Sequence, residues 1–393
     1  MERRIHLRLV SLDLALPPVA GLYVHVPVRR GAHTYDDSYA VPLDAADAPR
    51  VVSALRRELR LYARQYAHEE PLRTLYLGGG RPSLLSLQQL HSILNTLQET
   101  LDLSAVEEVT LEANPADLDS DYARGLRRMG VDRVSLEALS FSGPALAAIE
   151  APHTAGDVDQ ALRVLGAVGP SSVSATLLFG WPEQSHDDWS ATLETAVARD
   201  LPHLSIVEAS SAAGPVASET ARAHRLQRAM SILESEGYAQ YELTHFARPG
   251  ARSRHQTRYY AHDNQLALGP SSESFWWGRR ATRTRARRWT NVSDLDRYVT
   301  LLREQYPPVA YRQTLDRTAL AQEYVMLRLR TAAGLDLDHL QQQYGVDLHA
   351  EAGDLLARLR DEGLARADDH SVRLTARGRL VTDAITEKLM PSR

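Results

Sequence analysis

The sequence contains no cysteine among its 393 residues. This absence excludes disulfide bonds, a thiolate nucleophile, cysteine-ligated zinc and an iron–sulfur cluster held by cysteines alone. It does not identify a cellular compartment, because a chain without thiols forms no disulfides in any compartment. The hydrophobic fraction of 44% and the charged fraction of 24% are typical of a soluble globular protein, and the length indicates two or three domains.

Lysine is nearly absent as well. Lys388 is the only lysine, so 44 of the 45 basic residues are arginine. A lysine that forms a Schiff base or acts as a general base is therefore not expected. The net charge of −5 argues against a chain that coats nucleic acid.

The chain also lacks an uncharged apolar run of the length that a membrane span requires. Residues 1–20 are basic and apolar but carry Asp13 in the middle. We interpret them as a short N-terminal extension and not as a signal peptide. The expected location is the cytoplasm.

Short apolar and β-branched segments alternate with amphipathic ones between residues 21 and 240. The predicted strands are 21–26, 74–77, 109–112, 133–136, 173–179 and 203–207. Six successive strand–helix units predict a parallel sheet with right-handed crossovers, either an open doubly wound sheet or a partial barrel. In both folds the functional face lies at the carboxyl ends of the strands.

Two further segments have different patterns. Residues 241–312 are rich in Arg and aromatic residues and predict a connecting segment of loops and short antiparallel strands. Residues 313–393 predict helices at 320–329, 335–344 and 348–359, a strand at 370–375 and a helix at 376–389, which is the order of a winged-helix-like domain. This domain holds 13 acidic and 11 basic residues, so nucleic acid is not the expected partner.

A run of three glycines, Gly78, Gly79 and Gly80, directly follows a predicted strand, and Glu112 ends the next one. Consecutive glycines let a ligand approach the backbone and expose N–H donors. The run is not a P-loop, because no Gly-Lys-Ser/Thr follows. A tight turn would require the same glycines, so the run alone does not establish a binding site.

Six segments carry a family resemblance: LYVHVP (22–27), LYLGGGRPS (75–83), LEANP (111–115), RVSLEALSF (133–141), LLFGWPEQS (177–185) and YELTHFARPG (241–250). From about residue 20 to its C-terminus, the chain resembles the radical S-adenosylmethionine family of oxygen-independent coproporphyrinogen III oxidases. The haem chaperone (HemW-type) branch is the most similar. The resemblance implies an α/β fold, a partial (β/α)6 TIM-like barrel at 21–240 followed by the C-terminal helical domain.

The resemblance also implies a [4Fe–4S] cluster, and here the sequence departs from the family. The family holds the cluster with three cysteines in a loop after the first strand. Alignment on Tyr23, His25 and Pro27 places Arg29, His33 and Asp36 at those positions. Arginine stays protonated and has no acceptor, and His and Asp do not hold an all-thiolate cluster. We therefore expect no cluster, and we interpret this segment as a polar loop without a metal. A site for a harder metal formed by His33, Asp36 and Asp37 is the alternative.

The residues that bind S-adenosylmethionine in the family are altered too. Leu139, Ala151 and Thr176 stand where the family has Gln, Arg and Asp. Loss of a charge-assisted partner weakens binding by roughly 1.5–3 kcal/mol each. The resemblance assigns the remaining, vestigial cofactor site to Tyr23, Gly78–Gly80 and Glu112. We predict that S-adenosylmethionine is not used and that the chain is not an enzyme.

Haem-binding candidates come from the segment that matches the family's H-N-x-x-Y-W motif. They are His255, Tyr259 and Tyr260, and imidazole and tyrosinate are both haem ligand types. A hydrogen-bonded loop histidine explains His255 equally well.

The alternating arginines of a predicted strand, Arg283, Arg285 and Arg287, would share one face and suit porphyrin propionates. An exposed Arg-rich hairpin is the alternative explanation for these three residues.

The sequence therefore predicts a non-catalytic protein that binds haem or a porphyrin and passes it to a haem-accepting protein or a larger assembly. The alternative is a scaffold or interaction subunit that uses the radical S-adenosylmethionine fold without any ligand.

Overall fold

The computed structural model describes residues 20–30, 39–42, 47–66, 71–277 and 285–391. Most of the predicted N-terminal extension, residues 1–19, lies outside this part of the chain. Within it, the largest sheet has 12 strands in the order β14-β13-β12-β11-β1-β4-β5-β6-β7-β8-β10-β9.

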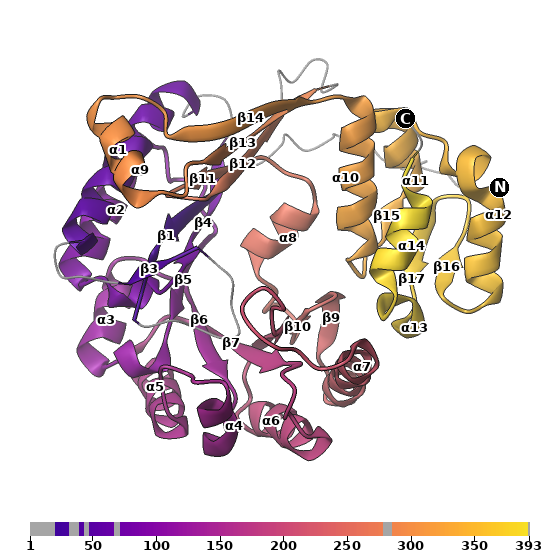
Figure 1. The fold of residues 1–393 in the computed structure, drawn as a ribbon, viewed down its shortest axis with the longest axis horizontal. Coiled ribbons are helices and arrows are strands. Elements are labelled where there is room, and N and C mark those ends of the chain that lie inside the picture. Colours follow the sequence, from indigo (N-terminus) through magenta and orange to yellow (C-terminus); the bar gives the residue numbers. More distant parts are fainter. Residues whose placement is uncertain (1–19, 31–38, 43–46, 67–70, 278–284, 392–393) are drawn as a thin grey trace, which may run out of the picture.

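Six consecutive parallel strands form the centre of this sheet. They are β1 (Ala20–Val26), β4 (Leu72–Gly79), β5 (Glu108–Ala113), β6 (Arg133–Leu139), β7 (Ser172–Phe179) and β8 (His203–Glu208). Each coincides with one of the six predicted strands. The sheet curves and remains open, so of the two predicted alternatives the partial barrel is confirmed (Figure 1).

Helices cover the convex side of the sheet (Figure 1). They are α1 (Asp47–Tyr66), α2 (Leu87–Thr100), α3 (Ser120–Arg128), α4 (Gly143–Ala148), α5 (Ala155–Val168), α6 (His186–Ala198) and α7 (Glu219–Ser235). Successive strand residues point to opposite faces. Leu22 and Val24 therefore pack in the hydrophobic core under these helices, whereas Tyr23 and His25 face the concave side.

The segment 241–312 extends the sheet at both edges. Its elements are β9 (Ala239–Glu242), β10 (His245–Ala247), α8 (Arg254–Tyr260), β11 (Gln265–Leu268), β12 (Glu273–Trp277), β13 (Ala286–Asn291), α9 (Leu295–Arg303) and β14 (Val309–Leu315). Strand β11 pairs parallel with β1, whereas β12, β13 and β14 are antiparallel. The segment is therefore part of the barrel sheet and more regular than the predicted connection.

Helix α8 lies on the concave side of the sheet, between the sheet and the C-terminal domain (Figure 1). The buried Glu108 carboxylate fixes its N-terminus, because it accepts hydrogen bonds from the backbone N–H groups of Arg254 (3.1 Å) and His255 (3.0 Å) and from the Ser253 hydroxyl (3.2 Å). An anionic side chain at a helix N-terminus is favourable. Arg133 Nε donates to the same carboxylate at 3.2 Å. The helix thus packs against the N-terminal parts of β1 and β4, is held by Glu108 at the start of β5, and forms a floor at this end of the barrel.

The C-terminal domain contains α10 (Arg317–Leu329), α12 (Leu348–Asp361), α13 (Ala376–Arg379), α14 (Thr382–Leu389) and a three-stranded sheet in the order β15-β17-β16. The predicted helix at 335–344 is wrong in its first two residues. Leu335 and Asp336 form β15 and pair with β17 (Ser371–Leu374), and only then follow α11 (Leu337–His339) and a π-helical turn. Strand β16 (Ala365–Ala367), which completes the sheet, was not predicted.

A buried histidine joins this domain to the barrel. His262 contacts Tyr344 Oη at 3.0 Å through Nδ1 and Glu323 at 3.2 Å through Nε2. Its ring stacks on Phe275, with centroids 4.6 Å apart. Burial lowers the pKa of His262. The neutral ring is therefore favoured, and it links α10 and the π-helical turn to strand β12.

A buried carboxylate joins α1 to the edge of the 12-stranded sheet that contains β11 and β13. Glu58 accepts hydrogen bonds from Gly269 N (2.8 Å), from Asn291 Nδ2 (2.6 Å) and from the Tyr298 hydroxyl. Burial raises the pKa of Glu58 to about 7. The contact attaches β11, β13 and α9 to the barrel helices.

No helix in the described part of the chain has both the length and the apolar character of a membrane span.

Candidate functional site: an open pocket at the carboxyl ends of the strands

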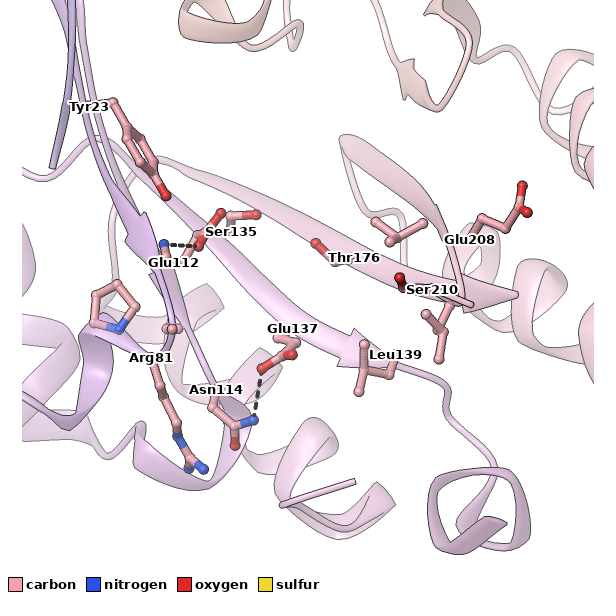
Figure 2. A pocket seen from close by; sticks show the side chains of 16 residues that line it. Tyr23, Arg81, Glu112, Asn114, Ser135, Glu137, Leu139, Thr176, Glu208 and Ser210 are labelled. Atoms are coloured by element: carbon pink, nitrogen blue, oxygen red, sulfur yellow. Dashed lines mark hydrogen bonds between the residues drawn. The ribbon is translucent and has the colours of Figure 1, made fainter. Parts of the chain in front are cut away.

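A cavity of about 350 Å³ opens at the carboxyl ends of the parallel strands. Four of the parallel strands contribute polar side chains to it, as Figure 2 shows: Tyr23 from β1, Glu112 from β5, Glu137 from β6 and Thr176 from β7. Strand β8 ends at its rim with Glu208. The place that the sequence marked as the vestigial cofactor site is therefore an open pocket, not one refilled by side chains.

The glycine run forms the turn beside this cavity. Glu112 accepts a hydrogen bond from Tyr76 Oη at 2.6 Å and another from the backbone N–H of Gly79 at 3.1 Å. Burial, followed by the Glu112 charge, raises the pKa of Tyr76 well above its ordinary value. A Cβ on Gly78 would lie 2.9 Å from Glu112 Oε2, and Gly79 has a φ of 109°. The glycines and Glu112 are thus held together by the fold itself.

The arginine that lines the cavity is paired with an aspartate. Arg81 donates from Nε and Nη2 to the Asp117 carboxylate at 2.6 and 2.7 Å, and Ser83 donates to it as well at 2.6 Å. The Arg81 and Asp117 side chains are only 3% and 7% exposed. This charge-paired guanidinium is therefore not available for strong recognition of an anionic ligand in the cavity.

Several polar residues of the pocket were not identified from the sequence, among them Asn114 and Glu137. Asn114 Nδ2 donates to Glu137 at 3.2 Å and to His153 Nδ1 at 3.1 Å. His153 Nε2 in turn bonds the Ala138 carbonyl at 3.0 Å, and burial lowers the pKa of this imidazole. Glu137 lies two residues after Ser135 on a strand whose alternate side chains face the cavity. That alternation is the signal that would have found it.

The altered cofactor positions do not all lie in the cavity. Leu139 and Thr176 line it, but Ala151 packs against the apolar cluster that contains Leu139, Leu178 and Trp181. Leu139 ends β6 in the left-handed region, with φ at 60°, where a side chain other than Gly, Asn or Asp is strained. The change at this position therefore gives the pocket an apolar wall where the family has an amide.

The former cluster segment is described only at its ends. Arg29 ends the short strand β2 (Val28–Arg29), which pairs with β3 (Val41–Pro42), whereas His33 and Asp36 lie outside the described residues. His25 bonds the Tyr39 carbonyl at 2.7 Å through Nε2 and the Tyr23 hydroxyl at 3.2 Å through Nδ1. In the part of the chain that the structure describes, no three His, Asp or Glu side chains are grouped to hold a metal ion.

His255 lies in the floor of the barrel. Its Nδ1 is 2.9 Å from Thr74 Oγ1, and its Nε2 is 3.1 Å from Gln265 Nε2. The ring also packs on Tyr76 at a centroid distance of 5.0 Å. Burial lowers the pKa of His255 to about 4. Both nitrogens have partners, so coordination of a haem iron would require one of these contacts to break.

Tyr259 and Tyr260 are more accessible. Tyr259 is 48% exposed, and its ring meets that of Tyr260 edge to face with centroids 5.3 Å apart. The Arg285 side chain is exposed and Arg287 is half-buried in β13, and their spacing places them on one strand face. Arg283 lies outside the described residues.

The structure does not bring these arginines to the tyrosines. The arginine of β13 that faces α10 is Arg288, whose Nη1 is 2.8 Å from Glu323 Oε1. Since side chains alternate along a strand, Arg287 points to the opposite face. The two sets of haem-binding candidates therefore do not form one preassembled site.

Family models match two parts of the chain. The Radical SAM superfamily matches residues 37–196, and the HemN C-terminal domain matches residues 315–381. The solved structure of Escherichia coli coproporphyrinogen III oxidase (HemN), described as a radical SAM enzyme, superposes with a TM-score of 0.82. It is 22% identical and covers 95% of this chain and 90% of its own. The two family-model matches, together with the fold, thus indicate a radical SAM-type protein.

Two curated relatives place the chain more narrowly. The heme chaperone HemW of Mycobacterium tuberculosis (strain CDC 1551 / Oshkosh) is 30% identical over 385 residues, which cover 94% of each chain. The Bacillus subtilis (strain 168) heme chaperone HemW is 26% identical and covers 92% of this chain and 97% of its own. The chain belongs to the HemW family.

Proposed function

We propose that this protein is a haem- or porphyrin-binding member of the HemW family that works without a [4Fe–4S] cluster and without S-adenosylmethionine chemistry. One observation carries the proposal: a HemW relative matches over 94% of the chain, and yet the sequence contains no cysteine. The full-length relationship supports haem as the cargo. The missing thiolates support a non-catalytic role in carrying it to an acceptor.

The donor set does not fit the cluster. Arg29 at the first ligand position is a permanent cation without an acceptor atom, and the chain offers no thiolate anywhere else. The match to the Radical SAM superfamily begins at residue 37, after the segment that holds Arg29, His33 and Asp36. No step of the proposed function therefore passes through an iron–sulfur cluster.

The open pocket also supports the loss of S-adenosylmethionine. Glu112 is already bonded to Tyr76 and Gly79, and Arg81 is neutralised by Asp117. Leu139 and Thr176 line the wall where the family carries an amide and a carboxylate. Losing such partners costs about 1.5–3 kcal/mol each, which lowers affinity by about tenfold or more per residue.

Reconstitution tests the non-catalytic assignment. After anaerobic incubation with iron, sulfide and reductant, we expect no absorbance band near 400 nm from a bound cluster, no retained iron after desalting and no 5′-deoxyadenosine from S-adenosylmethionine. A cysteine-containing HemW relative treated in parallel provides the positive control. Retained iron and sulfide together with 5′-deoxyadenosine would show that the chain is an active radical enzyme.

We propose Tyr259 as the iron ligand, with Tyr260 as a stacking partner. The Tyr259 side chain is accessible, whereas both imidazole nitrogens of His255 are engaged. His255 is then a positioning residue that holds α8 in the floor. Arg283, Arg285 and Arg287 remain the proposed propionate partners, which requires the two sets of residues to come together when haem binds. The exposed Arg285 is the one to test first.

A haem titration tests this proposal. We expect a saturable Soret band in the wild-type protein, at least about tenfold weaker binding in Tyr259→Phe, and a smaller loss in Arg285→Gln. His255→Ala should retain the wild-type Soret maximum while losing stability. Tyr306→Phe, which removes the hydroxyl of a tyrosine that is 61% exposed elsewhere on the surface, is the control. Absence of a saturable band would reject the haem proposal and favour an interaction subunit.

A further inference from the structure

A second candidate site lies on the outer side of the barrel, in a groove of about 380 Å³ between α1 and α9. Helix α9 packs beside α1 there (Figure 1). Leu61 and Leu302 supply the apolar part of its lining. All the other lining residues are polar and can donate hydrogen bonds: Ser53, Arg56, Arg57, Arg60 and Gln305.

Among the residues that the structure describes, the three arginines of this groove have no carboxylate partner closer than 3.9 Å. Arg56 donates from Nε to Thr96 Oγ1 at 2.8 Å, an uncharged acceptor. Arg60 Nη2 lies 3.9 Å from Glu99 Oε2. Arg57 is exposed and has no ion pair within the described part of the chain. By contrast, Arg50 near the start of the same helix bonds Asp47 at 2.9 Å.

The groove therefore carries a local positive charge in a protein whose net charge is −5. Arg56 and Arg60 are four residues apart on the same helix, a spacing at which like charges repel. Neither Asp nor Glu is among the described residues that line the groove. A bound anion with more than one negative charge would relieve this repulsion and use the hydroxyl and amide donors as well.

We propose that this groove binds the phosphate groups of a small multivalent anion, such as inorganic pyrophosphate or the diphosphate tail of a nucleotide. Guanidinium forks match the geometry of phosphate oxygens and remain charged at every physiological pH. The groove shares no residue with the proposed haem ligands, so the phosphate site is independent of haem binding.

Calorimetric titration with pyrophosphate and with ADP, in magnesium-free buffer at low salt, tests this site. The double variant Arg57→Gln/Arg60→Gln removes the two least-partnered guanidiniums. We expect at least tenfold weaker binding of both ligands. The matched control is Arg127→Gln/Arg128→Gln, which removes two exposed charges from α3 and should leave affinity unchanged. Thermal unfolding of each variant verifies that it is folded.

Comparison of pyrophosphate with ADP distinguishes a site for inorganic phosphates from a site for a nucleotide, since both ligands carry a diphosphate group. Equal affinities show that only the phosphates are recognised, and tighter binding of ADP shows that the groove also contacts the nucleoside. Absence of pyrophosphate and ADP binding, or equal weakening in both double variants, would overturn the proposal. Tighter binding of a hexaglutamate peptide than of either ligand would also overturn it, because the occupant would then be an acidic protein segment.

Discussion

We expect Glu108→Ala to lower the free energy of unfolding by about 3–5 kcal/mol, the loss that follows when one partner of a buried ion pair is removed. The variant leaves the guanidinium of Arg133 buried without its carboxylate, and both side chains of this pair are only 6% exposed. It also removes the acceptor of the two backbone N–H groups that begin α8. Urea denaturation at pH 7.5 measures the change.

Glu107→Ala provides the matched control for this prediction. Glu107 is the preceding residue and forms ion pairs with Arg73, Arg254 and Arg258, but its side chain is 31% exposed. Pairs of this kind contribute about 0–1 kcal/mol. If the two variants lose equal stability, Glu108 does not anchor α8 as described.

The second large effect is a loss of stability in acid. Burial lowers the pKa of His255 from 6.5 to about 4, so the folded protein holds this ring neutral where the unfolded chain protonates it. The stabilising contribution is present above pH 6.5 and disappears as the pH falls through 6.5 toward 4. At about 1.4 kcal/mol for each unit of pKa, the total loss is about 3 kcal/mol.

Urea midpoints of the wild type and of His255→Gln, measured between pH 7.5 and 4, test this prediction. The variant is expected to be less stable at neutral pH but to lose less stability on acidification. Burial lowers the pKa of His203, His245 and His262 as well, so part of the acid dependence remains in the variant. Parallel profiles for the two proteins would contradict the role assigned to His255.

Glu58 has the opposite pH dependence. Burial raises its pKa from 4.5 to about 7, so its stabilising contribution is complete below pH 4.5 and is lost as the pH rises from 4.5 through 7. The buried histidines and this carboxylate therefore favour opposite ends of the same pH interval. Because several buried histidines oppose this one carboxylate, we expect stability to rise with pH across the interval, and Glu58 only reduces the slope.

Periodicity was sufficient to predict the barrel strands, because each is a short apolar run flanked by amphipathic helices. The same reasoning failed where pairing is set by distant residues. Leu335 reads as the start of a helix, but pairing with Val372 draws it into β15. Likewise, the local sequence of β11 does not show whether the strand is parallel or antiparallel. Its parallel pairing with β1 depends on the position at which the chain leaves α8.

The candidate site was predicted in part for a similar reason. The glycine turn and Glu112 follow directly from the end of a strand, and Leu139 and Thr176 were placed by the family resemblance. Whether His255 is accessible was not predictable, because its burial depends on hydrogen bonds with Thr74 and Gln265. Alternation indicated that Arg285 and Arg287 share a face, but which element that face meets is a property of the tertiary fold.

The position of α8 affects the route by which a small molecule can reach the barrel interior. Helix α8 lies at the N-terminal ends of the strands, whereas the cavity opens at their carboxyl ends, beside Glu208. A small molecule in the cavity of about 350 Å³ is therefore expected to enter and leave at the carboxyl ends of the strands and not past α8.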